Sequence, residues 1–493
     1  MNFSIIRYIL SSVLAFEGIF LLLPCAVGAI YGEREAFAYL FVAALSICFG
    51  FLGRVKKPKS KEIYSKGGLV TVSFSWILLS LVGAVPFVLT GEIPRYEDAL
   101  FEVISGLTTT GASILNDVEA ISRCTAFWRC FTHWIGGMGV LVLILAILPL
   151  SGSYNMHLMR AESPGPSVGK LVPKVRQTAM ILYAIYGVIT VVEIVALMIA
   201  GLPLFDAATL TFATVGTGGF GLLNSSIASY SLAIQIIFTV FMLLSSINFS
   251  VYYLILVRKA GEAFRFEEMR WFLAIVFGSA LLITFNIKDG FDSLFMAFHT
   301  ALFQVATVIS TTGFATVDFN LWPEFSKSVL LFLMFVGACA GSTGGGFKVS
   351  RLMLLARSIK NEIICVAHPR TVKKVHMNGR MMSETVLKTV HVYLGAYVMI
   401  LIVSVILISI DGFDLETNFS AVMATLNNIG PGFGKVGPTG NFSGFSVFSK
   451  VVLMFDMLAG RLELFPILAL FHPGIWQIKY GWRSDREVSE QEA

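Results

Sequence analysis

Apolar residues run along this chain in long blocks that alternate with shorter ones. A helix that crosses a bilayer needs about 20 mostly apolar residues. The long blocks predict ten spanning helices, over residues 9–30, 36–52, 69–89, 127–150, 180–202, 232–257, 271–287, 329–355, 390–410 and 447–471. Four shorter apolar stretches lie between them, over residues 99–107, 207–215, 294–309 and 415–429. Because these four are too short to cross, they predict re-entrant segments.

The positions of Lys and Arg predict the orientation. They gather in five connecting segments, residues 54–66, 157–176, 258–270, 348–388 and 479–483. All five fall on one side if the short stretches re-enter, and they scatter to both sides if the short stretches cross. Short cytoplasmic loops are enriched in Lys and Arg. The pattern therefore supports re-entry and predicts that both chain termini are cytoplasmic.

Composition favours a membrane protein over a soluble one. Hydrophobic residues make up 56% of the 493 residues and charged residues only 14%, whereas soluble domains carry roughly 45–50% and about 25%. The net charge of +5 is small, so no nucleic-acid partner is expected. The six Cys do not form a disulfide or metal-binding pattern. We expect no enzyme and no cofactor on this chain.

One layout occurs four times: a span, a short helix, a Gly-rich turn and a second span. Acidic residues stand near the start of each short helix, where an Asp is expected to cap it; they are Glu97, Asp98, Asp206, Asp292 and Asp414. The turns that follow contain Thr109, Thr110, Gly111; Gly216, Thr217, Gly218; Thr311, Thr312, Gly313; and Asn428, Ile429, Gly430. The repeat predicts four equivalent units within one chain.

The turns have the composition of a cation selectivity filter. A dehydrated cation needs oxygen ligands, and rings of backbone carbonyls supply them. Gly permits the positive φ that turns successive carbonyls one way, Thr adds a hydroxyl, and the negative end of each short helix favours a cation. Non-helical backbone at membrane depth is tolerated where it lines such a path. The alternative is that these are Gly-rich packing turns between helices.

The predicted fold class is an all-α polytopic membrane protein, with four pseudo-repeats around a central ion pore and an extra N-terminal helix pair. The predicted units are the helix pair with its basic loop (1–66), repeats 1 to 4 (67–174, 175–265, 266–380 and 381–473) and a cytoplasmic tail (474–493).

The span over residues 329–355 contains a Gly-rich interruption at residues 337–346. Each Gly inside a helix costs up to about 1 kcal/mol relative to Ala, so this helix is expected to break. Our hypothesis is a gate below the filter; the alternative is a kinked packing site. The candidate gate residues are Gly341, Ser342, Thr343, Gly344, Gly345, Gly346, Lys348 and Arg461.

Arg461 lies inside the last apolar span, where an unpaired Arg costs about 2.5–3.5 kcal/mol on insertion scales. It either pairs with Asp456 or Glu463 or forms a cation barrier against the Gly-rich loop. Two further motifs are rejected: residues 216–221 fit a dinucleotide fingerprint without a βαβ unit, and residues 341–348 lack the Lys and Ser/Thr spacing of a phosphate loop.

Six runs make the sequence resemble the TrkH/TrkG/KtrB family of bacterial potassium uptake proteins over almost the whole chain. They are GLTTTGA (106–112), HWIGGMG (133–139), TGGF (217–220), STTGF (310–314), GSTGGGFK (341–348) and GRLE (460–463). The N-terminal helix pair resembles the TrkH branch more than the shorter KtrB branch.

The resemblance implies a K⁺ substrate bound at the turn residues, with filter glycines at Gly111, Gly218, Gly313 and Gly430. It also implies a homodimer in the lipid of the bacterial cytoplasmic membrane, regulated by a cytosolic TrkA-like ring of nucleotide-binding subunits. A Ser at the first filter glycine accompanies Na⁺ transport in plant relatives, so Gly111 favours K⁺. The fourth turn departs from the Thr-Gly pattern.

The competing function is a secondary transporter of an organic solute or Na⁺ that uses broken helices. Such transporters usually consist of two related halves, whereas this chain shows four quarters, which favours a pore. Passive flux and symport with H⁺ or Na⁺ are both left open.

Overall fold

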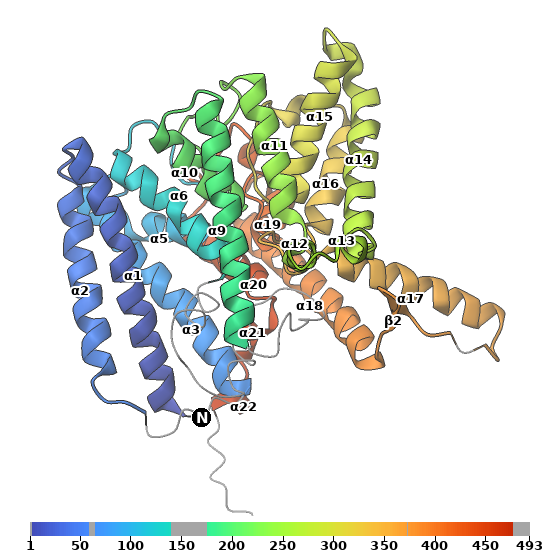
Figure 1. The fold of residues 1–493 in the computed structure, drawn as a ribbon, viewed down its shortest axis with the longest axis horizontal. Helices are drawn as coiled ribbons and strands as arrows, with labels where there is room; N and C mark the ends of the chain where they lie inside the picture. Colours follow the sequence, from blue (N-terminus) through green and yellow to red (C-terminus); the bar gives the residue numbers. More distant parts are fainter. Residues whose placement is uncertain (1, 59–64, 140–174, 372, 477–493) are drawn as a thin grey trace, which may run out of the picture.

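The computed structural model describes residues 2–58, 65–139, 175–371 and 373–476. These residues form helices joined by loops, with one two-stranded hairpin (Figure 1), which confirms the predicted fold class. Among them, six helices are long and apolar enough to cross a membrane, or seven spans if one bent pair counts as a span. Part of the predicted basic segment at 157–176, the end of the span at 127–150 and most of the tail lie outside the described residues.

The extra N-terminal pair is a helical hairpin, α1 (Phe3–Tyr31) and α2 (Ala36–Arg54). The pair packs on helices of the first repeat, mainly through α1. At its turn, the Glu33 carboxylate accepts hydrogen bonds from the backbone N–H groups of Arg123 (2.8 Å) and Cys124 (2.9 Å), at the start of α6. The Tyr39 hydroxyl lies 3.0 Å from that of Thr125. The pair therefore supports the first repeat from outside.

Repeats 1 and 2 follow the predicted layout. The described part of repeat 1 contains α3 (Ser65–Gly83) with its continuation α4 (Val85–Thr90), the short helix α5 (Tyr96–Leu107) and α6 (Arg123–Gly137). Repeat 2 consists of α9 (Val175–Ile199), the short helix α10 (Leu204–Val215), α11 (Leu232–Ser246) and α12 (Phe249–Leu256), followed by α13 (Ala260–Phe264).

Repeats 3 and 4 have the same order with added short pieces. Repeat 3 consists of α14 (Glu267–Ile287), η1 (Lys288–Gly290), the short helix α15 (Leu294–Ile309), η2 (Phe319–Leu321), α16 (Glu324–Val336), α17 (Val349–Ala367) and the hairpin β1 (His376–Met377) with β2 (Arg380–Met381). Repeat 4 consists of α18 (Glu384–Ile408), η3 (Ser409–Asp411), the short helix α19 (Leu415–Leu426), η4 (Gly434–Val436), α20 (Val447–Arg461), α21 (Phe465–Ala469) and α22 (Pro473–Trp476).

The four short helices begin differently from the prediction that an Asp caps each of them. Asp414 does cap α19, accepting from the backbone N–H of Thr417. In α15 the cap is Ser293, one residue after the predicted Asp292. The acidic residues of α5 and α10 lie within the first helical turn. There they still oppose the positive helix end, so the acidic signal marked these helices correctly but gave the wrong cap.

The second helix of each repeat ends at a similar point. Counted from their N-caps at Ser122, Ser231, Pro323 and Ser446, the helices α6, α11, α16 and α20 contain 15, 15, 13 and 15 residues. The predicted break of the span at 329–355 is confirmed. The predicted continuous spans at 232–257 and 447–471 are wrong, because α11 and α12 meet at 90° and α20 ends before the left-handed residues Glu463 and Leu464.

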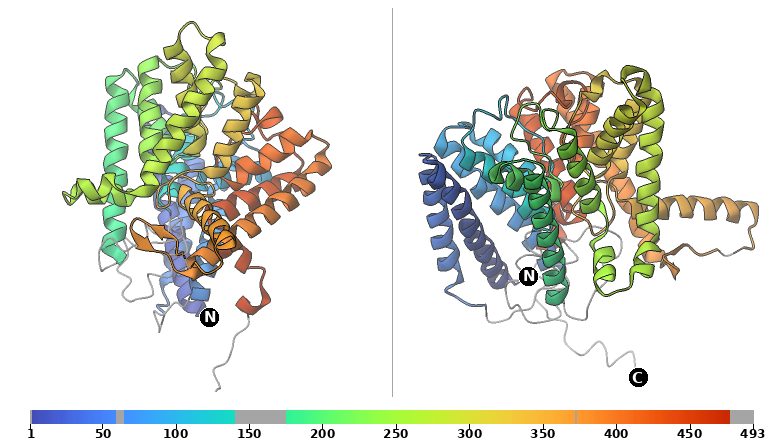
Figure 2. Two further views of the ribbon diagram at one scale, coloured as in Figure 1. Left: turned by 90° about the vertical axis from the view of Figure 1, so that its right-hand side faces the viewer. Right: turned by 45° about the horizontal axis from the view of Figure 1, so that its top comes forward.

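The N-terminus and α22 lie at the same end of the molecule (Figure 1). The Lys66 ammonium at the start of α3 donates to the carbonyl of Gly474 in α22 (3.0 Å). In the tilted view the helices of the four repeats follow one another around a common centre (Figure 2, right). That centre is where the four Gly-rich loops meet.

Candidate functional site

The four loops share one backbone conformation. A left-handed residue, with φ between 55° and 60°, opens each loop: Thr109, Thr217, Thr311 and Asn428. Two residues later comes a glycine with φ between 78° and 93°: Gly111, Gly219, Gly313 and Gly430. We name residues 109–111, 217–219, 311–313 and 428–430 loops 1 to 4, and number the three positions in each. Four loops with one sequence of φ signs form one repeated structural unit.

The middle position of each loop is tied back to its own short helix. The N–H groups of Thr110, Gly218, Thr312 and Ile429 donate to carbonyls five residues earlier, at 2.8, 2.8, 2.9 and 2.8 Å. Because C=O and N–H point in opposite directions across a trans peptide, the first-position carbonyls point away from the helix ends.

The second loop corrects the sequence prediction by one residue. We expected Gly218 to correspond to Gly111, but Gly219 has the matching positive φ and Gly218 occupies the middle position. Thr217 is the left-handed residue that fixes this register. The sequence offered three glycines within four residues there, so spacing alone could not select the right one.

The third-position glycines close the loops into a ring. A Cβ on Gly111 would fall 2.0 Å from the carbonyl oxygen of Gly218, and one on Gly219 would fall 1.9 Å from that of Thr312. The corresponding distances are 2.1 Å from Gly313 to Ile429 and 2.7 Å from Gly430 to Thr110. Each loop therefore faces the next in chain order, and the fourth faces the first. Any side chain at these positions would collide with a neighbouring carbonyl.

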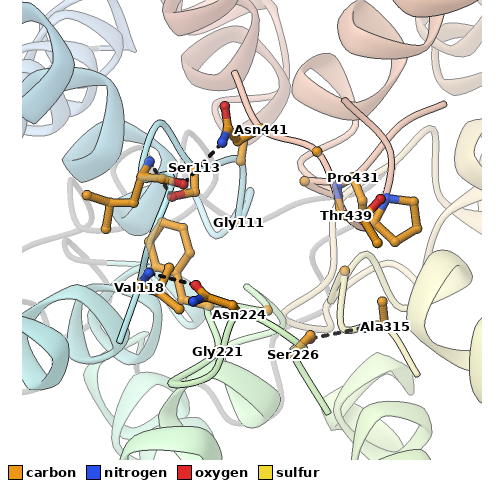
Figure 3. Close-up of a pocket in the computed structure, with 18 of the residues that line it drawn as sticks. Gly111, Ser113, Val118, Gly221, Asn224, Ser226, Ala315, Pro431, Thr439 and Asn441 are labelled. Carbon is orange, nitrogen blue, oxygen red and sulfur yellow. Dashed lines mark hydrogen bonds between the residues drawn. The ribbon is translucent and has the colours of Figure 1, made fainter. Parts of the chain in front are cut away.

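An open pocket of about 190 Å³ lies on one side of this ring, lined by all four loops. Figure 3 shows Gly111, Gly221, Ala315 and Pro431 around its opening. Hydrogen bonds join each adjacent pair of loop segments at this rim: Val118 N to Asn224 Oδ1 (2.8 Å), Ala315 N to Ser226 Oγ (3.2 Å), Gly434 N to Asn320 Oδ1 (3.1 Å) and Asn441 Nδ2 to Asn116 Oδ1 (2.8 Å). The Asn224 amide also donates to Asp117 and holds the pKa of that carboxyl below its usual value.

The atypical fourth loop is held to the first by its Asn side chain. Asn428 Nδ2 donates to the Thr110 hydroxyl (3.0 Å) and to the carbonyl of Met457 in α20 (2.9 Å). Asn428 takes the left-handed position that Thr occupies in the other loops. The departure from the Thr-Gly pattern therefore leaves the backbone geometry unchanged.

The Gly-rich segment between α16 and α17 lies against the opposite side of the ring. Gly345 N donates to the Thr311 hydroxyl (2.6 Å). A Cβ on Gly345 would fall 2.3 Å from the carbonyl oxygen of Asn427, and one on Gly344 would fall 2.8 Å from that of Ser310. The segment therefore packs directly under loops 3 and 4. Glycines are needed there because any side chain would collide with the loop backbone.

The unpredicted break between α11 and α12 provides partners for this segment. The carbonyl of Ser246 accepts from Cys339 N (3.1 Å), and Phe249 N donates to the carbonyl of Gly341 (3.0 Å). Breaking a helix frees backbone groups that need new partners. The Gly-rich segment satisfies them, which explains a 90° bend at a site without Gly or Pro.

Two charged residues, Lys348 and Glu268, form hydrogen bonds with the Gly-rich segment and the start of α17. Sequence reasoning identified Lys348 but not Glu268. Lys348 donates to the carbonyl of Gly344. Glu268, buried in the first turn of α14, accepts from Ala340 N (2.7 Å) and Ser350 N (3.1 Å). The only sequence signal for Glu268 was an acidic residue at the start of an apolar span, which usually indicates a solvated helix end.

Arg461 connects the Gly-rich segment to the end of α6. Its guanidinium donates to the carbonyls of Thr343 (2.9 Å), Gly136 (2.5 Å) and Gly137 (2.6 Å). Of the two carboxylates considered as alternative partners, Glu463 forms an ion pair with Arg351, and Asp456 accepts from Ser404 (2.8 Å). The structure therefore brings Arg461 against the candidate gate residues.

Comparisons with known proteins agree along nearly the whole chain. The TrkH family, described as a cation transport protein, matches residues 36–288 and 291–478. The Trk system potassium uptake protein TrkH of Escherichia coli (strain K12) is 37% identical over 474 residues, 94% of this chain and 97% of that protein. TrkG from the same strain is 32% identical over 460 residues, 92% of this chain and 94% of that protein. The crystal structure of the potassium transporter TrkH from Vibrio parahaemolyticus matches with a TM-score of 0.87 at 32% identity, covering 97% of this chain and 100% of that one.

Proposed function

Because this chain belongs to the TrkH family of cation transport proteins, we propose that it takes up K⁺ across the bacterial cytoplasmic membrane through the ring of four loops. The observation that carries the proposal is the closed contact of each third-position glycine with the next loop's carbonyl. Relatives of nearly the same length are named potassium uptake proteins, which supports K⁺ as the cation.

In this proposal the loops act as the selectivity filter. Carbonyls of the first and middle positions replace the water around K⁺. The N–H groups of the middle positions are already bonded to the short helices, so they do not compete with the cation for these oxygens. The C-terminal ends of α5, α10, α15 and α19 add negative potential at the ring. The open pocket above the ring is the entrance.

The Gly-rich segment is the proposed gate. It lies directly below loops 3 and 4, and the Lys348 ammonium and Arg461 guanidinium are bonded to it. Two cationic groups beside a cation path raise the electrostatic barrier as well as blocking space. Uptake then requires this segment to move, which releases its contacts with α11, α12 and α14.

The resemblance to TrkH proteins extends the proposal to the assembly. We propose a homodimer regulated by a cytosolic TrkA-like ring of nucleotide-binding subunits, with both termini on that side. Helix α17 extends away from the helical body (Figure 1). It exposes Ile359, Ile363 and Val366 at helical spacing, which suits burial against a second copy.

Uptake of radioactive Rb⁺ into proteoliposomes tests the function. K⁺ is expected to compete strongly and Na⁺ weakly, and a variant that lacks Gly344 and Gly345 is expected to take up Rb⁺ faster than the wild type. No Rb⁺ uptake by either protein would overturn the pore proposal and favour the secondary transporter of an organic solute. Unchanged uptake in the shortened variant would overturn the gate alone.

A further inference from the structure

A buried ion pair lies behind loops 1 and 2. Glu102 of α5 and Arg129 of α6 have side chains only 0% and 3% exposed, and their Oε1 and Nε atoms are 2.5 Å apart. The guanidinium also donates to the Gly221 carbonyl (3.1 Å) and the Ser113 hydroxyl (3.2 Å). Ser113 and Gly221 each stand two residues after the third loop position. One side chain therefore holds the same point of two neighbouring loops.

His133, one turn further along α6, joins the same two loops. Its Nδ1 lies 2.8 Å from the carbonyl oxygen of Gly106, in the last turn before loop 1, and its Nε2 lies 3.3 Å from the backbone N of Phe220, directly after loop 2. A neutral imidazole with its proton on Nδ1 satisfies both contacts. A Cβ on Gly218 would fall 2.1 Å from Nδ1. The imidazole ring of His133 therefore packs against Gly218, the residue whose carbonyl oxygen faces Gly111.

The other three repeats lack these groups at the equivalent positions. Counting from the four N-caps, His133 corresponds to Met242, Met334 and Met457, and Arg129 corresponds to Phe238, Leu330 and Leu453. Counting back from the left-handed loop residues, Glu102 corresponds to Leu210, Gln304 and Ala421.

Since loops of the same backbone shape form in the other three repeats with uncharged residues at all of these positions, the fold does not require charges here. A buried ion pair is usually no more stabilising than apolar residues of similar size. The charges in repeat 1 therefore call for a role other than stability. Their contacts all fall on the segments that flank loops 1 and 2.

We propose that Glu102, Arg129 and His133 are positioning residues that set the discrimination between K⁺ and Na⁺ by fixing the separation of loops 1 and 2. The proposal rests on the proposed function as a K⁺ pathway. Discrimination depends on the number and spacing of carbonyl ligands that the filter holds against collapse onto a smaller ion. Loss of these side-chain contacts lets loop 2 move onto the smaller Na⁺ ion. Selectivity for K⁺ over Na⁺ then falls, while ion uptake continues.

The first test uses His133→Met and Arg129→Lys in the full-length protein. His133→Met installs the residue of the other three repeats and removes both hydrogen bonds. Arg129→Lys keeps the charge opposite Glu102 but loses the planar fork that reaches both loops. We expect the ratio of the Na⁺ inhibition constant to the K⁺ inhibition constant for Rb⁺ uptake to fall about tenfold, or ~1.4 kcal/mol. The maximal rate is expected to stay near that of the wild type.

The matched control is Met334→Leu, a volume-conserving change at the equivalent site of repeat 3, which is expected to retain selectivity. The double variant Glu102→Ala with Arg129→Leu copies the pair in repeat 4 and leaves neither charge buried alone. It is expected to fold and to lose selectivity like His133→Met. Thermal unfolding and size-exclusion chromatography, both in detergent, identify the variants that fold.

Wild-type selectivity in folded His133→Met and in the folded double variant overturns the proposal. If His133→Met does not fold, His133→Leu, which also removes both hydrogen bonds, takes its place with the same two outcomes. Absence of Rb⁺ uptake in the wild type would instead overturn the proposed function, so the two failures are distinguishable.

Discussion

The residues that define the ring are those whose backbone has a positive φ. Thr109, Thr217 and Thr311 adopt the left-handed conformation at some cost in strain, and the third-position glycines adopt it freely. Glycine is needed at these positions for two reasons. The backbone φ is positive, and a carbonyl oxygen lies where a Cβ would be. At this scale, strain and close approach select the residue type.

We predict that Gly219→Ala reduces K⁺-selective uptake at least about tenfold, because left-handed strain costs about 1–3 kcal/mol and the Cβ would lie 1.9 Å from the Thr312 oxygen. The measurement is Rb⁺ uptake competed by K⁺ and by Na⁺. Gly221→Ala is the control, since its nearest neighbours lie at 3.5 Å. Normal selectivity in Gly219→Ala would contradict the register of loop 2.

Sequence reasoning found most of the loop residues because Thr and Gly recur at a fixed distance from four apolar stretches. It placed the second loop one residue early because Gly216, Gly218 and Gly219 all lie within four positions. It did not find the contacts of Arg129, because a lone Arg in an apolar span does not show which distant carbonyls it reaches.

At the scale of elements, the common feature is that the second helix of each repeat ends after 13 to 15 residues. The break in repeat 3 was predictable from its glycines. The break between α11 and α12 was not, because it depends on backbone groups of the Gly-rich segment about 100 residues later in the chain, such as Cys339 bonded to Ser246. Tertiary hydrogen bonds compensate there for a helix that local propensity would continue.

We predict that Glu268→Ala raises the basal rate of Rb⁺ uptake about tenfold. It leaves the N–H groups of Ala340 and Ser350 without their buried acceptor, a penalty of about 1–3 kcal/mol for each group that weakens the closed position of the Gly-rich segment. Glu268→Gln, whose amide oxygen still accepts, is expected to stay near the wild-type rate. A folded Glu268→Ala protein with an unchanged basal rate would argue against a gate held from α14.

At the scale of the whole molecule, the four repeats share one plan and differ in their supports. Repeat 1 has a buried ion pair. In repeat 3 the Gly-rich segment lies below loop 3, and in repeat 4 an Asn side chain reaches loop 1. The N-terminal pair packs on the outside of this arrangement, mainly against the first repeat. Its expected contribution is stability and not ion discrimination.

We predict that Glu33→Ala lowers the stability of the protein by about 1 kcal/mol, because it removes the acceptor for two N–H groups at the start of α6. Thermal unfolding in detergent measures the loss. The ratio of K⁺ to Na⁺ competition is expected to match the wild type. A change in that ratio without a change in thermal stability would mean that the N-terminal pair acts on the ring.

The most direct test of the central claim is anomalous diffraction from crystals of this protein grown with Rb⁺ in place of K⁺. The account predicts Rb⁺ density on the axis of the ring, between the carbonyls of Thr110, Gly218, Thr312 and Ile429. Density that lies only elsewhere in the protein, with none inside the ring, would contradict the claim that the four loops form the selectivity filter.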